Sequence, residues 1–313
     1  MTDASLPNDP LWPRAATWFI PAEKHSAAPC DLALLGVPAW RTSITPTGAH
    51  ATPAAVRDAL LRYSTYAASR GVDVAQLCAV DFGDVDDPDG PDGEKRVAEA
   101  VARASAAELL IALGGDNSIT HSVMRGLWPA EGELGNVGLI TIDAHHDLRD
   151  GINNGSPVRR LVEAGLAGVN VVQIGIADFS NSAAYSSRAH DLGITVIGRD
   201  ELRVLSLVDV SSQALAIAGA GGRPVFVDID VDVCDRAAVP GCPSAAPGGI
   251  SADELRQLAF LLARSPLVRG IDITEIDATL DAPDHRTVRL AALLVLEAAA
   301  GLGLRSETEQ TAG

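Results

Sequence analysis

The stretch VGLITIDAHHD at residues 137–147 decides the fold. Its first part is apolar without interruption, whereas a strand with one face in water alternates apolar and polar residues. An unbroken apolar run is typical of a strand buried on both faces of a parallel sheet. The run ends abruptly in charged and polar residues. The stretch therefore predicts a buried parallel strand that carries a polar cluster at its carboxyl end.

Seven further short apolar runs resemble this one, and each is bounded by Gly, Pro or Asp turn residues. They lie at residues 31–37, 77–85, 108–115, 170–176, 193–198, 224–233 and 269–277. Between them lie Ala/Leu-rich stretches with helical spacing, at Pro53–Tyr66, Glu94–Ala107, Val158–Ala164 and Ala252–Ala263. Alternating strands and helices predict an α/β protein: a three-layer α/β/α sandwich around a mostly parallel, about eight-stranded sheet.

Length and composition indicate one domain over residues 1–313, because single α/β domains commonly exceed 250 residues. Residues 1–28 and 306–313 are interpreted as peripheral tails, and DDPDGPDG at 86–93 as an acidic loop. No internal repeat is found.

The charge balance narrows the class of partner. The chain has 24 Lys and Arg against 41 Asp and Glu, a net charge of −17, which argues against nucleic acid or an anionic membrane as partner. The first residues have neither a basic start nor an apolar segment, and no stretch has the length of a membrane span. Four cysteines without metal-site spacing are typical of reduced thiols. We expect a cytoplasmic protein that acts on a small molecule.

Four polar clusters follow predicted strands, where ligands bind in open α/β sheets. They are Gly114–Ser118, Asp143–Asp147, Asp228–Asp232 and Glu275. In an extended segment, residues two apart point to the same side. We therefore expect one group of projecting side chains: Asp143, His145, Asp147, Asp230 and Asp232.

Four carboxylates packed together repel each other unless cations neutralise them. Two divalent ions would match four carboxylates in charge, and oxygen-rich ligation with imidazole favours Mn²⁺, although Ni²⁺, Co²⁺, Zn²⁺ or Fe²⁺ also fits. Two such ions can share a water and lower its pKa. An Asp-x-Asp pair alone is often a capping pair, but both motifs at strand ends together favour a two-metal hydrolase.

The motifs GGDNS, DAHHD, DIDVDVCD and ITEID resemble the blocks of the ureohydrolase superfamily, which includes arginase and agmatinase, in the same order. The resemblance covers roughly residues 30–300 and implies an arginase-like fold and a homo-oligomer, a trimer or a hexamer. It also implies that Asp143 and Asp230 bridge two Mn²⁺ ions, that Asp147 serves one ion, and that His145 with Asp232 serves the other. Glu275 matches the acidic residue that contacts the cationic substrate head, and Asp147 and Glu275 are the candidate catalytic residues.

Two departures separate this chain from most relatives. Asn117 stands where most carry a metal-binding His, and Asn154 stands where arginases and agmatinases carry a proton-shuttling His. An Asn oxygen can still ligate a hard ion, so Asn117 stays a candidate ligand of a weaker site. His121, four residues on, is interpreted as a helix-packing residue. A metal-poor regulatory homologue is the competing class.

The formimidoylglutamases are similar in narrower signals, which are Asp147-Leu148-Arg149, Gly155-Ser156-Pro157 and Asn181-Ser182 with Tyr185. This likeness implies hydrolysis of N-formimidoyl-L-glutamate to L-glutamate and formamide, a step of histidine breakdown. An agmatinase or a guanidino-acid hydrolase that releases urea remains the alternative.

The candidate substrate-binding residues follow from that substrate, which joins an amidine to two carboxylates. Arg149 and Arg159 can bind carboxylates through forked donors, although Arg159 or Arg160 is also consistent with a solvated helix face. The complete set is Arg149, Asn154, Ser156, Arg159, Asn181 and Glu275. A further hypothesis places Cys30 and Cys242 near each other at the mouth of the site.

Overall fold

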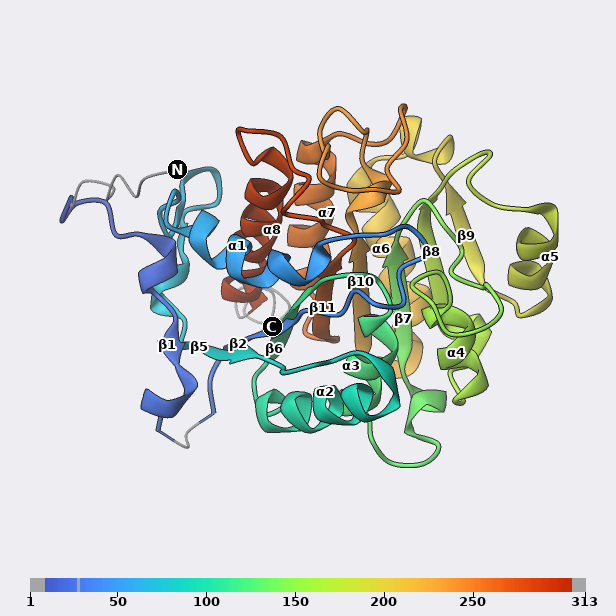
Figure 1. Cartoon of the computed structure of the whole chain (residues 1–313), viewed down its shortest axis with the longest axis horizontal. Coiled ribbons are helices and arrows are strands. Elements are labelled where there is room, and N and C mark those ends of the chain that lie inside the picture. The colour runs from blue at the N-terminus through green and yellow to red at the C-terminus, as the bar shows by residue number, and fades with distance from the viewer. Residues whose placement is uncertain (1–8, 27–28, 306–313) are drawn as a thin grey trace, which may run out of the picture.

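A nine-stranded sheet forms the centre of the computed structural model, which describes residues 9–26 and 29–305 (Figure 1). Every pair of neighbouring strands is parallel. The spatial order is β1 (Ile20–Pro21), β5 (Ala79–Asp84), β2 (Leu32–Val37), β6 (Leu109–Gly114), β11 (Val268–Thr274), β10 (Val225–Asp230), β7 (Gly138–Ile142), β8 (Val171–Ile176) and β9 (Thr195–Gly198). All eight predicted runs are strands of this sheet, so the fold prediction is confirmed.

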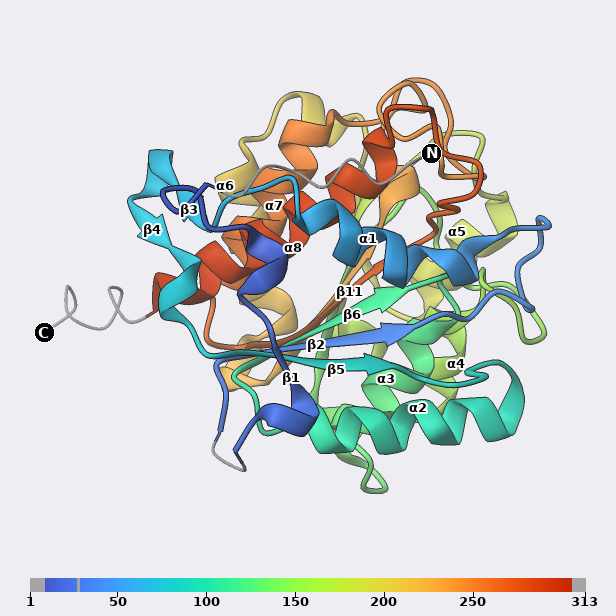
Figure 2. The same cartoon turned by 60° about the vertical axis from the view of Figure 1, so that its left-hand side comes forward.

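Helices cover both faces of the sheet. One face carries α1 (Thr52–Leu60), α6 (Leu207–Ala218), α7 (Ala252–Ala263) and α8 (Arg286–Gly303). The other carries α2 (Gly90–Ala104), α3 (Ile119–Leu127), α4 (Pro157–Glu163) and α5 (Ala183–Asp191). Figure 2 shows α1 and α8 on one side of the strands and α2 and α3 on the other. The three-layer sandwich is therefore confirmed.

The two buried cores explain why the strands are apolar throughout. In β6, Leu109, Ile111 and Leu113 pack into the core beneath α1 and α8, while Leu110 and Ala112 pack into the core beneath α2 and α3. Successive side chains of a strand point to opposite faces, so both faces need apolar residues.

Some predicted boundaries differ from the structure. The helix predicted at Pro53–Tyr66 ends at Leu60, because the chain turns there to form the small antiparallel pair β3 (Tyr66–Ala67) and β4 (Val72–Asp73). The loop predicted at 86–93 is shorter, because α2 begins at Gly90 and places Pro91 in its first turn, where the missing N–H costs nothing. Residues 20 and 21, assigned to a tail from the sequence, form β1 at the edge of the sheet.

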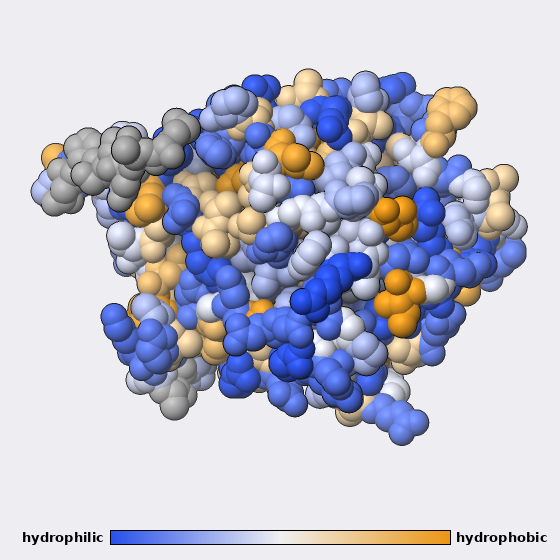
Figure 3. All heavy atoms as spheres, viewed as in Figure 1, coloured by the Kyte–Doolittle hydropathy of each residue, from blue (hydrophilic) through white to orange (hydrophobic). Residues whose placement is uncertain are grey.

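The surface seen in Figure 3 is mostly hydrophilic, with hydrophobic side chains in separate patches. None of the helices within residues 9–26 and 29–305 has the length and apolar character needed to cross a membrane.

Four adjacent strands in the middle of the sheet carry the polar clusters. They are β6, β11, β10 and β7, and because they are parallel their carboxyl ends meet at one edge. The turn after β6 needs Gly115, since a Cβ there would lie 1.9 Å from the carbonyl oxygen of Ala39. This close approach lets residues 116 and 117 reach the same edge as Glu275, which follows β11.

Candidate metal centre and active site

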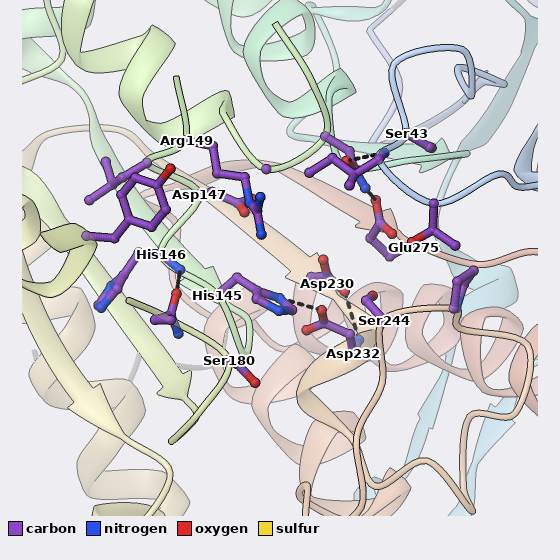
Figure 4. A pocket seen from close by; sticks show the side chains of 18 of the residues that line it. Ser43, His145, His146, Asp147, Arg149, Ser180, Asp230, Asp232, Ser244 and Glu275 are labelled. Atoms are coloured by element: carbon purple, nitrogen blue, oxygen red, sulfur yellow. Dashed lines mark hydrogen bonds and ion pairs between the residues drawn. The ribbon is translucent and has the colours of Figure 1, made fainter. Parts of the chain in front are cut away.

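A cavity of about 340 Å³ opens at this edge, a volume within the usual range for small-molecule sites. It is lined by eight of the twelve predicted site residues: His145, Asp147, Arg149, Asn154, Asn181, Asp230, Asp232 and Glu275. Figure 4 shows His145, Asp230 and Asp232 at its base, with Arg149 and Glu275 projecting from its walls. Asn117 and Asp143 lie buried beside it.

The segment after β7 bends at residues 143–145 rather than staying extended, and it brings His145, Asp147 and Arg149 to the cavity with Asp143 buried beside it. Asp143 Oδ1 accepts a hydrogen bond from the His145 backbone N–H at 2.6 Å, while Asp143 Oδ2 is buried without a partner among the described residues. His146 also lines the cavity, but its ring is held by Gln173, with Nδ1 2.6 Å from Gln173 Oε1. Asp147 lies in the left-handed region, with φ of 53°, a conformation that is uncommon for a non-glycine residue and concentrates at functional sites.

Asp230 and Asp232 reach the site through a turn rather than through an extended strand. Asp230 ends β10 and caps the short 3-10 helix Val231–Val233, accepting the Asp232 N–H at 2.8 Å. The expected strand alternation is therefore wrong beyond residue 230, because the capped turn folds the chain back. The turn still brings both carboxylates to the cavity.

His145 and Asp232 converge on a common point. His145 Nδ1 lies 2.7 Å from Asp232 Oδ2, yet that oxygen has no hydrogen-bond partner, so the ring N–H does not point at it. The other oxygen of Asp232 accepts from the Ala144 N–H at 3.1 Å. A nitrogen and an oxygen that lie close together without facing each other have the arrangement of two ligands aimed at one cation.

The pKa values show that the cluster requires positive charge. Burial, reinforced by the charge of Asp232, raises the pKa of Asp143 to about 7. Burial likewise raises the pKa values of Asp147 and Asp230 well above the ordinary range. Burial alone would lower the His145 pKa, but the charges of Asp232 and Asp143 outweigh it and raise that pKa to about 12. Divalent cations would satisfy the same demand, so these residues fit a metal centre.

Ligand atoms gather in two overlapping groups, each within 4.8 Å of one another. One group is Asp143, His145 and Asp232, and the other is Asp143, Asp147 and Asp228. Asp143 belongs to both, which is the position of a bridging ligand. Asp230 lines the cavity but belongs to neither group. Asp228 was not among the predicted ligands, although its spacing of two residues from Asp230 places it on the same side of β10.

Asn117 does not present its oxygen to the metal centre. Its amide oxygen accepts from the hydroxyls of Thr120 at 3.0 Å and Thr274 at 2.9 Å. Its amide nitrogen donates to Asp147 Oδ2 at 2.5 Å. Two hydroxyl donors fix the amide with its oxygen turned from the cavity, so the ligand role of Asn117 stays a prediction that this orientation does not support. Asn117 holds Asp147 in place.

Glu275 is held at the cavity wall in the left-handed region, with φ of 63°. Its Oε1 accepts from the Asn117 backbone N–H and from the Asn154 amide, each at 2.8 Å. Burial, together with the charge of Asp116, raises its pKa to about 8. Asn154 also accepts from the Ile44 N–H at 3.1 Å, so it ties Glu275 to the loop above the cavity.

Arg149 is the unpaired cation of the cavity. Its guanidinium has no hydrogen bond or ion pair with any residue that the structure describes, and its aliphatic chain lies against Gly155, where a Cβ would be 2.8 Å from Cδ. Figure 4 shows this side chain pointing into the cavity. It is therefore free to bind an anion there.

Three other predicted substrate-binding residues use their polar atoms within the protein. Ser156 Oγ donates to Asn153 O at 2.7 Å at the start of α4. Arg159 donates to the carbonyl oxygens of Arg149 and Gly151 and to Glu163. Asn181 bonds to the backbone of His146 and Ala144. Asn181 lines the cavity, whereas Ser156 and Arg159 do not, because α4 directs them under the loop.

The remaining candidates lie away from the cavity. His121 Nδ1 is 3.6 Å from Glu94, and Arg160 pairs with the same carboxylate at 2.8 Å. His121 and Arg160 therefore have helix-packing roles. The hypothesis that Cys30 approaches Cys242 is wrong. Cys30 precedes β2 and lies near Cys78 at the amino edge of the sheet, whereas Cys242 is buried near Asp232 and Glu275 at the carboxyl edge.

The chain belongs to the arginase family, whose sequence model matches residues 30–301. It is 36% identical to the formimidoylglutamase of Halalkalibacterium halodurans and 34% identical to that of Bacillus subtilis, over 87% of this chain and 88% and 87% of those proteins. The crystal structure of the Bacillus subtilis formimidoylglutamase superposes with a TM-score of 0.88 at 32% identity and covers 97% of this chain and 96% of that one. The predicted resemblance is thereby confirmed.

Proposed function

We propose that the chain hydrolyses N-formimidoyl-L-glutamate to L-glutamate and formamide with two Mn²⁺ ions bound in the cavity. The observation that carries this proposal is the arrangement of the cavity, with a carboxylate-rich base and an unpaired Arg149 on its wall. The names of its relatives, formimidoylglutamases at 34–36% identity, support the same substrate. A formiminoglutamase from Trypanosoma cruzi was solved with Mn²⁺.

The metal ions would be held by Asp143, Asp147, His145, Asp230 and Asp232. Two divalent ions held there would lower the pKa of a bound water and so supply hydroxide near neutral pH. The protein positions these ligands through buried backbone contacts such as Ala144 N–H to Asp232 and His145 N–H to Asp143. Such contacts fix the ligand geometry before any ion binds.

The substrate has one cationic end and one anionic end. Glu275 is the carboxylate placed to accept hydrogen bonds from the amidine, since its second oxygen is not used by Asn117 or Asn154. Arg149 presents a planar fork to a glutamate carboxylate, a geometry that gives two charge-assisted hydrogen bonds. Together the two side chains would orient the formimidoyl carbon above the base of the cavity.

Hydrolysis adds the oxygen of water to the formimidoyl carbon and breaks the bond to the glutamate nitrogen, which leaves as an amine after gaining a proton. Asp147 is our candidate to carry that proton, because it lines the cavity beside the other candidate metal ligands, within reach of a substrate bound there. The Asn117 amide nitrogen holds the Asp147 carboxylate in position by donating a hydrogen bond of 2.5 Å to its Oδ2.

A substrate panel tests the proposal. The purified chain loaded with Mn²⁺ is assayed with N-formimidoyl-L-glutamate, agmatine, L-arginine and 3-guanidinopropionate, with formamide, urea and ammonia measured separately. Formamide and glutamate in equal amounts, with the highest kcat/KM for the formimidoyl substrate, are expected. Urea released more efficiently from a guanidino compound would assign the chain to a different substrate.

We further propose that this single catalytic domain assembles as a homo-oligomer and acts in the cytoplasm in histidine breakdown. Light scattering after size exclusion would give the subunit number. A monomer at micromolar concentration would contradict the assembly.

A further inference from the structure

Asp228 is a fully buried carboxylate that the proposed metal centre does not yet explain. It lies on β10, opposite Thr141 of β7 and Asp272 of β11 in the strand register. Asp228, Asp272 and Thr141 are each 0% exposed, and neither oxygen of Asp228 has a hydrogen-bond partner among the described residues. A buried carboxylate without donors is costly, so a native structure normally supplies a partner.

No neighbouring side chain donates hydrogen bonds to both oxygens of Asp228. Asp272 faces Asp228, but two carboxyl groups share a hydrogen bond only when one of them carries a proton. Even then one oxygen of Asp228 has no donor. The hydroxyl of Thr141 likewise has no partner. The structure thus leaves an oxygen lone pair of Asp228 available beneath the cavity.

That oxygen is within ligand distance of the metal centre. One oxygen each of Asp143, Asp147 and Asp228 lie within 4.8 Å of one another. Oxygens about 2.1 Å from one small divalent ion are at most about 4.2 Å apart, so the limit of 4.8 Å is close to this spacing and a small inward movement of the side chains would place the three oxygens around a single ion. Asn117, the predicted ligand at this position, instead turns its oxygen to Thr120 and Thr274.

We propose that Asp228 is a direct oxygen ligand of the ion held between Asp143 and Asp147, and that it supplies the ligand atom that Asn117 does not. Asp272 faces the same carboxyl group from the neighbouring strand β11. This inference rests on the proposed function only in requiring that the cavity binds two Mn²⁺ ions.

The test is a Mn²⁺ titration of chelator-treated protein, followed by calorimetry and by electron paramagnetic resonance of free Mn²⁺. We expect the intact chain to bind two ions. Asp228→Ser should weaken one site by about tenfold or more, the scale on which a change in metal ligation acts, and leave the other within about twofold. The matched control Asp272→Asn removes a buried acid from the facing strand but still donates to Asp228, so both sites should keep their affinity.

Thermal unfolding keeps the proposal testable if one variant folds poorly. Without metal, Asp228→Ser and Asp228→Asn should melt no lower than the intact chain, because each removes a buried carboxyl group that lacks hydrogen-bond partners, while the rise in Tm with Mn²⁺ should shrink. Two unchanged Mn²⁺ affinities in Asp228→Ser would overturn the proposal, and so would a lower metal-free Tm with an unchanged Mn²⁺ effect. An intact chain that binds two ions but hydrolyses no amidine would refute the proposed function and leave this inference standing.

Discussion

Replacing Arg149 by alanine should separate substrate binding from metal binding. Its guanidinium is the unpaired cation of the cavity and does not belong to either group of candidate metal ligands. We therefore expect Arg149→Ala to keep full metal content and to lose affinity only for substrates that carry a carboxylate.

The size of the effect follows from the contact that is lost. A hydrogen bond to a charged group contributes about 1.5–3 kcal/mol, and in the free protein the Arg149 side chain is exposed, so no internal ion pair offsets the loss. A value of about 2 kcal/mol corresponds to a decrease of roughly 30-fold in kcat/KM. Arg149→Lys should recover part of it, because lysine retains the charge without the planar fork.

The assay compares N-formimidoyl-L-glutamate with an N-alkylformamidine that has no carboxylate. The matched control is Arg203→Ala, which removes the same charge from an exposed side chain paired with Asp200 at 2.7 Å outside the cavity. A 30-fold loss confined to the diacid is expected for Arg149→Ala, with no loss in the control. Equal losses on both substrates, or loss of bound Mn²⁺, would show that Arg149 only balances the charge of the cavity.

Three further outcomes are expected. Asp230→Asn should remove both Mn²⁺ ions if Asp230 bridges them; two retained ions with ordinary turnover, counted by metal analysis, would contradict this. Asn117→His should raise the affinity of the weaker of two Mn²⁺ sites, because imidazole would add a nitrogen donor where the amide oxygen is turned to Thr120 and Thr274; calorimetric affinities equal to those of the intact chain would count against it. Although burial alone would raise it, the close approach of His121 at 3.6 Å and the hydrogen bond from Arg160 at 2.9 Å lower the Glu94 pKa to about 2. Because this folded-state pKa is below the ordinary 4.5, the contribution of Glu94 is present above pH 4.5 and is lost as the pH falls towards 2. Glu94→Gln should therefore lower the unfolding free energy by at most about 3 kcal/mol at pH 7, and a difference from the intact chain that does not narrow below pH 4.5 in urea titrations would refute the assignment.

Local pattern explains most of what was predicted correctly about the fold. Strands buried on both faces need unbroken apolar runs, and such runs are readable because they depend only on neighbouring residues. Helix ends were less accurate. The end of α1 at Leu60 depends on where the chain must turn to form β3, and no feature of residues 53–66 records that tertiary requirement.

In the candidate site, too, some features follow from local sequence pattern and others depend on the tertiary structure. The sequence alone determined that DAHHD and DIDVD follow strands, and parallel pairing then brought them to one edge of the sheet. Only the tertiary structure decided which atoms are free. Asn117 has the right residue type for a ligand, but two threonine hydroxyls from α3 and β11 fix its amide the other way.

Hydrogen bonds from distant segments also distinguish Arg149 from Arg159. The two arginines have the same donors, so the sequence cannot tell which of them binds substrate. Arg159 donates hydrogen bonds to backbone carbonyls near α4, whereas the donors of Arg149 are unpaired and face the cavity. Residue type and spacing determine which groups can do chemistry, but hydrogen bonds from distant segments decide which of them remain available, because those partners are chosen only when the layers pack.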